Sequence, residues 1–482
     1  MSKVRKILPT PGSRTKAVLI FALVVLTAAT FAGTFRNKFT GWDDKQFILD
    51  NGAMRAPALP HLATQWIYPL RALRPYCMYI PVTHTVWWTT YNLSSIGTDP
   101  DNPHPRSSWF HGLSLLLHIA TGAVVFILIS SWLPRASPDG RYPLWAAFFG
   151  TALFMLHPVQ VQAVAWIAGA RDLLFSLLGC LALLSFTRSR FKLAAVFCVA
   201  AYFSKPTAVV IPLLMLVFWW FTDQRRNRRP LVWIGVLLVA ALPIVAITRR
   251  AQLTQFAPPV DLWARPFIAA DALAFYAGKI AWPVRLCIEY GRSPGVVLRM
   301  PATPLIGGVF VLLMAAVWLF RRRIPVAVRF CASLFLVPLL PVLGFVPFVF
   351  QSVSTVADHY LYLPMMGLAF ALAWALNHSR SRAPFISAAV VLMCLGIASF
   401  RQTALWKDDL SLFGRVVEVN PKSTAANNNL GAANFLRGNP EEAIAFWKKT
   451  LVIDPDYPFA KIAMEKFGNL APSPSPSPEK HE

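Results

Sequence analysis

Charged residues are scarce in this sequence. Only 14% of its 482 residues are charged and 56% are hydrophobic, whereas about a quarter of an ordinary soluble protein is charged. This composition excludes a soluble globular protein and predicts a multi-pass membrane protein. Acidic residues are scarcest, because 22 Asp and Glu stand against 46 Lys and Arg, which gives a formal net charge of +24.

Cysteine is also rare, and no two of the six cysteines form a CxxC pair. Most lie in apolar runs, where a thiol behaves as a small hydrophobic group. The sequence therefore predicts neither a metal site nor a disulfide framework, and a divalent metal cofactor has no support in it. A pairing of Cys77 with Cys287 outside the membrane stays open.

The basic residues form short clusters between apolar runs. This pattern is typical of cytoplasmic loops rather than of a nucleic-acid-binding surface, so nucleic acid is not an expected partner. Five basic residues precede the first apolar run, and the positive-inside rule then keeps the N-terminus in the cytoplasm. A cleaved signal peptide is the alternative, and it too would leave the next segment outside.

The apolar runs predict an all-α membrane domain with about eleven spans, several of them short for a bilayer. They cover residues 17–35, 108–132, 144–156, 173–186, 193–203, 208–221, 231–247, 304–320, 325–345, 361–376 and 384–400. Alternation of sides then places four segments together on the outer face: 36–107, 157–172, 249–303 and 346–360. The stretch 267–282 is amphipathic and is interpreted as an interfacial helix. An odd number of spans also places the C-terminus outside.

An acidic pair, Asp43 and Asp44, lies just after the first span, on the predicted outer face. Two adjacent carboxylates flanked by aromatic residues can supply a general base and a group that orients it or tunes its pKa. The alternative is a helix start, with Asp43 or Asp44 as the N-cap of a helix that begins at Lys45.

The chain becomes polar after Arg401, and a helical-repeat pattern appears. With Thr424 as position one, small and aromatic residues fall near the positions where the paired helices of a tetratricopeptide unit interlock, namely Leu430, Gly431, Gly438, Ala443, Trp447 and Pro455. We therefore expect a membrane catalytic domain over 1–402, a tetratricopeptide-like region over 403–470 and a disordered Ser-Pro-rich tail over 471–482. So short an array is expected to pack on the membrane domain or on a partner.

Several separated motifs, taken in order, resemble one family. They are Trp42-Asp43-Asp44 with Ile48 and Asn51, Pro103-His104, Phe110-His111, Leu117-His118, His157-Pro158-Val159, Ala163 to Ile167, Arg171-Asp172, Ser204-Lys205-Pro206, Ala357 to Pro364, and the terminal repeat. The set resembles the transmembrane-and-tetratricopeptide-repeat glycosyltransferases. These belong to the GT-C superfamily of polyprenyl-phosphate-sugar-dependent transferases, and the likeness covers nearly the whole chain.

The resemblance implies transfer of a sugar, with mannose as one candidate, from a polyprenyl-phosphate donor to a hydroxyl acceptor, with inversion. Asp43 is then the base and Asp44 a positioning group. The acceptor is a protein or glycan, which the repeat region could hold, and the bilayer is the other partner. The expected place is a bacterial inner membrane with an undecaprenyl carrier and a periplasmic site, or the endoplasmic reticulum with a dolichyl carrier if the source is eukaryotic.

The lipid phosphate needs cations or hydrogen-bond donors to stabilise it as it departs. Arg171 and Lys205, both predicted beside the membrane on the outer face, are the first candidates, and His157 and His359 are the next. The alternative for the two cations is that each extends to the membrane interface. For the two histidines the alternative is that each satisfies neighbouring backbone groups.

The chain departs from the family pattern at three positions. Gln162 stands where relatives usually carry an acidic residue, Ala170 where a basic residue is usual nearby, and His359 where Arg is usual. Two other functions stay open: a lipid- or glycan-modifying transferase, such as an O-antigen-ligase-like or aminoarabinose-transferase-like enzyme, and a repeat-bearing transporter or scaffold. A transporter is disfavoured because transporters place ionisable groups at mid-bilayer, and the predicted spans are nearly free of them.

Overall fold

The computed structural model describes residues 11–55, 63, 66–67, 79–99, 104–222, 227–252 and 260–468. Within these ranges the chain is helical and contains no strand. The predicted tail at 471–482, Cys77 and Pro103 lie outside the described residues. The remaining five cysteines are free thiols, four of them buried.

Five helices in the described part of the chain are long and apolar enough to cross a membrane. They correspond to α1 (Pro11–Phe31), α5 (Ser107–Ala136), α8 (Ala170–Thr187), α11 (Arg229–Gln252) and α17 (Ala383–Thr403). A sixth candidate is a bent pair, in which α6 (Pro143–Leu156) is followed at an angle of 50° by the short segment that ends with α7 (Val161–Ala165).

Further apolar helices are shorter. They include α9 (Phe191–Tyr202), α10 (Ile211–Phe221), α14 (Thr303–Leu319), α15 (Val326–Leu336) and α16 (Met365–Asn377). Each predicted apolar run coincides with one of the long or short helices, so the all-α membrane class is confirmed for the described residues. Which short helices cross the bilayer, and with them the count of about eleven spans, stays a prediction.

Short elements connect these helices. They are α2 (Gly52–Arg55), α4 (Pro81–Ser94) and the single turns η1 (Ala32–Arg36), η2 (Lys45–Leu49), η3 (Pro158–Gln160), η4 (Ile167–Gly169), η5 (Pro206–Val210), η7 (Val337–Val342), η8 (Val349–Ser352), η9 (Asp358–Leu361) and η10 (Ala404–Trp406). Four of these turns, η2, η3, η5 and η9, carry or adjoin the predicted site residues Asp44, His157, Lys205 and His359.

Glycines allow close packing in the centre of the bundle. A Cβ on Gly150 of α6 would lie 2.3 Å from the carbonyl oxygen of Ala369 in α16, and one on Gly367 would lie 2.6 Å from that of Cys331 in α15. Membrane helices use small residues in this way, because lipid provides no hydrophobic force that drives helices together. The central helices α6, α15 and α16 therefore pack backbone to backbone.

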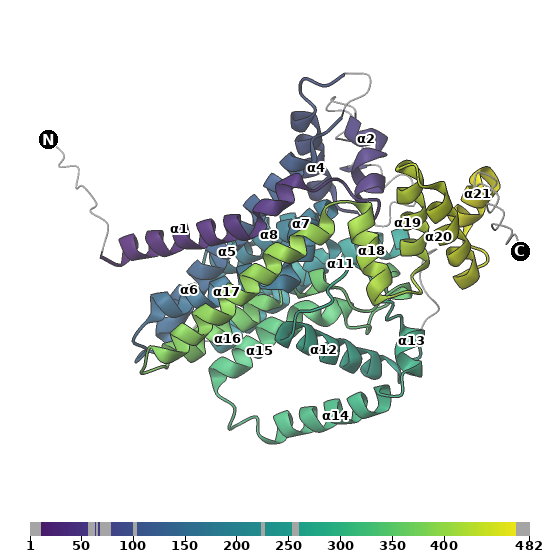
Figure 1. Ribbon diagram of the computed structural model, residues 1–482. Coiled ribbons are helices and arrows are strands. Elements are labelled where there is room, and N and C mark those ends of the chain that lie inside the picture. The colour runs from purple at the N-terminus through teal and green to yellow at the C-terminus, as the bar shows by residue number, and fades with distance from the viewer. Residues whose placement is uncertain are drawn as a thin grey trace, which may run out of the picture.

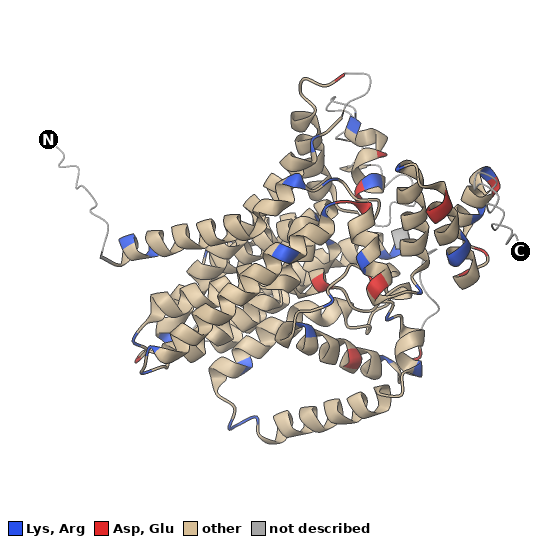
Figure 2. Cartoon of the chain, viewed as in Figure 1, with Lys and Arg blue, Asp and Glu red and all other residues tan. Residues whose placement is uncertain are grey.

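The two ends of the bundle differ in charge. At one end a hydrogen bond of 3.2 Å between Ser137 and His378 joins the α5–α6 and α16–α17 connections, which carry Arg141 and Arg380. Figure 2 shows that Asp and Glu gather mainly toward the other end, where the C-terminal helices lie. This separation agrees with the predicted sidedness, while the orientation in the membrane stays a prediction.

The segment after α11 forms a separate layer. It contains α12 (Arg265–Ala281), which was predicted as a helix over 267–282, and α13 (Pro294–Arg299). Asp271 of α12 is buried and forms an ion pair with Arg292. Below α12 in Figure 1 lies α14, which packs mainly on α12 and α13 and exposes most of its apolar side chains, including Leu305 and Leu312.

The C-terminal region consists of α18 (Asp409–Val419), α19 (Thr424–Leu436), α20 (Pro440–Ile453) and α21 (Pro458–Phe467). Neighbouring helices pack in sequence, and α18 joins the array to the bundle (Figure 1). Gly431 lies against Trp447, since a Cβ there would be 2.4 Å from the indole nitrogen. The predicted interlocking of these two positions is confirmed, and the assignment to the tetratricopeptide class stays a prediction.

Candidate functional site

Asp44 joins two distant segments through its buried carboxyl group. Oδ2 accepts hydrogen bonds from the backbone N–H and the hydroxyl of Thr40, both at 3.0 Å, and Oδ1 accepts one from the N–H of Ala168 at 2.9 Å. The side chain makes no capping bond to the turn that starts at Lys45. Asp44 does stand at the N-cap position of this turn, as the alternative predicted, but its carboxyl accepts from an amide of η4 instead of capping the turn.

Burial sets the protonation of Asp44. It raises the pKa of this carboxyl from 3.8 to about 7, although the hydrogen bonds from Thr40 and Ala168 act in the opposite direction, and the nearby Asp43 adds to the rise. Both oxygens already have partners, so Asp44 fixes the loop and offers little room for a substrate. Its predicted role as a positioning group fits this geometry.

Asp43 points away from Asp44 and toward α8. Its Oδ2 lies 2.8 Å from Nη2 of Arg171. The Asp43 side chain keeps 26% of its surface exposed, whereas that of Arg171 keeps 7%. Of the two acids, Asp43 is thus the one that a substrate can approach.

An interruption of the helix before α8 sets the position of Arg171. The backbone of Trp166 leaves the helical conformation, which ends α7, and α8 then begins at Ala170. The guanidinium of Arg171 lies over the rings of Trp166 (4.8 Å) and Phe47 (5.7 Å). Its Nε and Nη1 are buried and have no hydrogen-bond partner among the described residues. A buried donor without an acceptor costs roughly 1–3 kcal/mol, so these two nitrogens are suited to bind an anionic ligand.

Lys205 forms a second ion pair beside the first. Its Nζ lies 2.5 Å from Oδ1 of Asp172, and the rings of Phe175 and Tyr360 both lie 5.8 Å from the ammonium group. Burial lowers the pKa of Lys205, and the charge of Asp172 opposes that shift. Arg171 and Asp172 take different partners because neighbours on a helix point apart. Arg171 and Lys205 are each 6% exposed and paired with carboxylates, which disfavours the alternative that each extends to the membrane interface.

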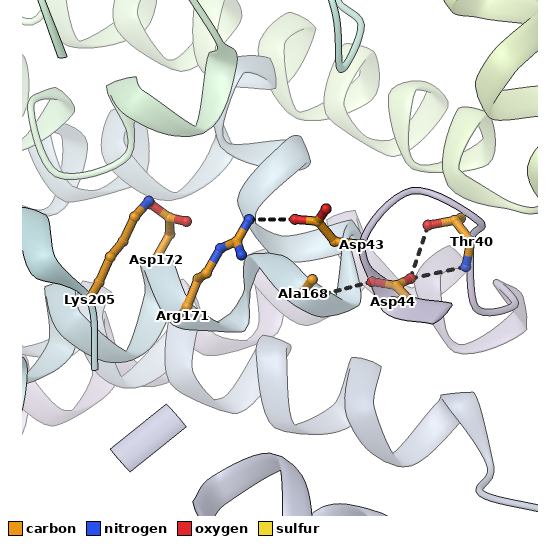
Figure 3. A network of polar contacts seen from close by, with 7 residues as sticks. All are labelled: Thr40, Asp43, Asp44, Ala168, Arg171, Asp172 and Lys205. Atoms are coloured by element: carbon orange, nitrogen blue, oxygen red, sulfur yellow. Dashed lines mark hydrogen bonds and ion pairs between the residues drawn. The ribbon is translucent and has the colours of Figure 1, made fainter. Parts of the chain in front are cut away.

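Figure 3 shows these groups in a row. Arg171 lies between the Lys205–Asp172 pair on one side and the two acids of the 37–44 loop on the other. Residues from three regions of the chain therefore meet: the loop after α1, the start of α8 and the turn between α9 and η5. The sequence predicted all three for the outer face, and the structure brings them into direct contact.

His157 is held by backbone groups. Its Nε2 lies 3.0 Å from the carbonyl oxygen of Ile280, and its Nδ1 accepts a hydrogen bond from the N–H of Val159 at 3.3 Å. Burial lowers the pKa of His157 to about 4, so the ring is neutral near pH 7. These contacts favour the structural alternative for His157 and link the bend after α6 to α12.

His359 lies closer to the cations. Its ring contacts those of Trp166 (centroids 5.6 Å apart) and Tyr360 (4.3 Å), and its backbone N–H donates to Oε1 of Gln162 at 2.9 Å. Burial, with the charges of Lys205 and Arg171, lowers the pKa of His359 well below its usual range. Nδ1 of His359 and Nε2 of Gln162 are buried without a partner among the described residues. His359 can therefore act as a neutral hydrogen-bonding group, and Gln162 orients the turn that carries it.

Two aromatic residues of the site were not singled out in the sequence. Trp166 lies under Arg171, and Tyr360 contacts both Lys205 and His359. Both belong to motifs of the family resemblance, which was the only available signal. Among the described residues, no cluster of three or more His, Cys, Asp or Glu side chains could hold a metal ion.

Comparison with known proteins finds relatives of one kind. The chain is 23% identical over 477 residues to a protein O-mannosyl-transferase of Caenorhabditis elegans, an alignment that covers 92% of this chain and 64% of the relative. It is 24% identical over 499 residues to the protein O-mannosyl-transferase TMTC3 of Mus musculus, over 90% of this chain and 51% of the relative. It is 22% identical over 518 residues to the protein O-mannosyl-transferase Tmtc3 of Drosophila melanogaster, over 89% of this chain and 54% of the relative.

These relatives support the resemblance to the TMTC proteins over most of the chain. The chain spans about half to two-thirds of the length of the curated relatives that it matches. No family model matches the sequence. No solved structure matches it either.

Proposed function

We propose that this chain is a membrane glycosyltransferase of GT-C type, which moves mannose from a polyprenyl-phosphate donor to a hydroxyl acceptor. The observation that carries the proposal is the Asp43–Arg171 pair. One guanidinium nitrogen binds the more exposed acid at 2.8 Å, and two others are buried without a partner among the described residues. The names of the relatives supply the sugar and suggest a protein acceptor.

The chemistry needs a base, an in-line attack and a stabilised leaving group. Asp43 takes the proton of the acceptor hydroxyl, the oxygen attacks the anomeric carbon, and the bond from that carbon to the phosphate oxygen breaks. The electron pair of that bond leaves with the polyprenyl phosphate. A single displacement of this kind inverts the anomeric centre.

Arg171 serves both partners of the reaction. Its Nη2 orients Asp43, while Nε and Nη1 donate to the phosphate as negative charge develops on the leaving oxygen. The ring of Trp166 beneath the guanidinium restricts its rotation. Lys205, paired with Asp172, adds positive potential from the adjacent turn. The site and the C-terminal helices then face the non-cytoplasmic side, where a lipid-linked donor reaches it from the bilayer.

A direct test uses the full chain in lipid nanodiscs with radiolabelled polyprenyl-phosphate mannose and a Ser/Thr-rich peptide. Transfer and release of polyprenyl phosphate are measured together. We expect Asp43→Asn to lower kcat by roughly 10²- to 10⁴-fold, the usual contribution of general base catalysis, while the chain stays folded, because the asparagine oxygen can still accept from Nη2 of Arg171. Asp50→Asn is the matched control, because Asp50 lies in the same region with its side chain 55% exposed.

Two results would contradict the proposal. Absence of donor consumption by the wild-type chain, with glucose as well as mannose donors, would reject the glycosyltransferase function. Normal turnover by Asp43→Asn would reject Asp43 as the base, and a loss confined to Asp44→Asn would move the base by one residue.

A further inference from the structure

The acidic loop, defined as residues 37–44, is bound along one side by the segment that joins α17 to α18. The side-chain amide of Asn37 donates to the carbonyl oxygen of Thr403 at 3.1 Å. The backbone N–H of Lys38 donates to the carbonyl oxygen of Lys407 at 2.9 Å. The membrane domain and the C-terminal helices therefore meet at the loop that carries the proposed base.

Asp409, the first residue of α18, makes the contact nearest to that base. Its Oδ1 accepts the N–H of Gly41 at 2.6 Å, two residues before Asp43. The fit is close, since a Cβ on Gly41 would lie 3.1 Å from Oδ2 of Asp409. Beside it the rings of Trp42 and Phe413 pack with centroids 6.2 Å apart. A carboxylate that accepts a backbone N–H makes one of the stronger hydrogen bonds in proteins.

The preceding residue, Asp408, makes contacts within the C-terminal helices instead. Its Oδ1 caps α18 by accepting from the N–H and hydroxyl of Ser411, at 3.0 and 2.9 Å, and its Oδ2 lies 2.8 Å from Nη2 of Arg437. The start of α18 and its link to α19 are therefore secured without Asp409. The carboxyl of Asp409 is thus available to the acidic loop, and its bond to Gly41 does not serve the helix.

We propose that Asp409 is a positioning residue for Asp43, so that α18 forms part of the active site. The inference rests on the proposed function, in which Asp43 is the base. Asp409 fixes the loop at Gly41, and the hydrogen bond that Asp44 accepts from the N–H of Ala168 fixes it on the other side. Asp43 lies between these two anchors, which hold its carboxylate in reach of Arg171. A misplacement of about 1 Å in such a group is enough to lower a rate by roughly 100-fold.

The C-terminal helices also connect, through Glu289 and Tyr290, to the turn that carries His359. Glu289 is buried and accepts hydrogen bonds from the hydroxyl of Ser423 at 2.6 Å and the amide of Asn420 at 2.9 Å. The next residue, Tyr290, donates to Asp358 at 2.8 Å, which precedes His359. The region from α18 to α19 therefore braces both the acidic loop and the turn that carries His359.

The test compares Asp409→Ala, Asp409→Asn and Glu418→Ala in the full chain. Glu418 lies on the same helix, with its side chain 67% exposed, and serves as the control. We expect Asp409→Ala to lower kcat for donor consumption roughly tenfold to hundredfold, with donor KM within about twofold of wild type. Asp409→Asn should keep most of the activity, because its amide oxygen can accept the same N–H. Hydrogen exchange of peptides covering residues 37–44 should be faster in Asp409→Ala alone.

Three results would overturn the proposal. They are wild-type turnover by Asp409→Ala, equal loss in Asp409→Asn and Asp409→Ala, and unchanged exchange of the acidic loop in Asp409→Ala. If the wild-type chain consumes no donor, the proposed function fails, and the exchange measurement then decides about the anchor independently. Faster exchange in Asp409→Ala with normal exchange in Asp409→Asn would support it.

Discussion

Nη2 of Arg171 lies 2.8 Å from Oδ2 of Asp43, and this contact links the loop after the first membrane helix to the start of α8. In the proposed reaction the same guanidinium orients the base and receives the leaving phosphate. Its two functions require the planar, three-nitrogen geometry of arginine, and lysine has a single ammonium group.

Arg171→Lys therefore tests geometry separately from charge. We expect a rise in donor KM and a fall in kcat, together a loss of roughly tenfold or more in kcat/KM, because one ammonium group cannot bind both Asp43 and a phosphate in the fork arrangement. The measurement is a donor titration. Arg437→Lys, which alters a half-exposed pair with Asp408, is the control. Donor titrations of Arg171→Lys that overlay those of wild type would place the phosphate elsewhere.

The Lys205–Asp172 pair allows stability and binding to be separated. Lys205→Met alone leaves a carboxylate that is 2% exposed without its partner, and breaking such a buried pair costs about 3–5 kcal/mol. The double variant Lys205→Met/Asp172→Leu should recover most of the thermal stability, because apolar replacements of a buried pair are often neutral.

Donor use should stay impaired in that double variant if Lys205 contributes to the phosphate site, and this is the expected result. Full recovery of both stability and donor affinity would make the pair purely structural. Thermal unfolding and donor titration of the same preparations give the two readouts.

The two buried carboxyl groups of Asp44 and Asp358 should contribute less to stability as pH rises from about 4 to about 7. Burial raises the pKa of Asp44 from 3.8 to about 7 and that of Asp358 likewise to about 7. In this window these two carboxyl groups keep protons in the folded chain that they release in the unfolded chain, so their contribution to the free energy of unfolding decreases with rising pH and levels off above about 7. His157 and His359, whose pKa values burial lowers, act in the opposite direction. Relative to wild type, the slope of Tm against pH between about 4 and 7 should become more positive in Asp44→Asn, and more positive still in Asp44→Asn/Asp358→Asn. An unchanged slope in the double variant would contradict the assignment.

Removal of residues 420–482 keeps α18 and its contact with Gly41 but deletes α19 to α21. If the C-terminal helices hold the acceptor, transfer to a macromolecular acceptor should fall while slow hydrolysis of the donor continues. Equal loss of both activities would mean that these helices only cover the site. Thermal stability of the shortened chain must be measured in parallel, because Glu289 loses Ser423 and Asn420 as partners.

The sequence predicted the helices well because membrane spans are long apolar runs. Each run coincides with a helix in the structure. The positive-inside rule, with the alternation of sides from span to span, predicted Asp43, Arg171 and Lys205 on one face. The alternation of sides cannot show which side chains form pairs, however. That Arg171 takes Asp43 while Asp172 takes Lys205 follows from the break at Trp166, which sets where α8 begins.

Sequence patterns could not predict the hydrogen bonds that site side chains make with backbone groups. Asp44 accepts from an amide 124 residues away, and His157 lies against a carbonyl oxygen 123 residues away. Any residue can supply such a group, so no side-chain motif marks it. Asp409 was missed for a related reason, since an acid beside the N-cap Asp408 looks like part of the same helix start.

The exposed position of α14 affects how the protein is handled. The helix packs mainly on α12 and α13, and its remaining surface is apolar and exposed, with Leu305 at 72% and Leu312 at 71%. If α14 lies in the bilayer, as the sequence predicts, acyl chains contact its exposed side chains, and solubilisation then replaces most of the surroundings of α14. A change around α14 can reach α12, on which it packs and which carries Asp271 of the buried Asp271–Arg292 pair. Detergent chain length and lipid thickness therefore need to be controlled in every assay.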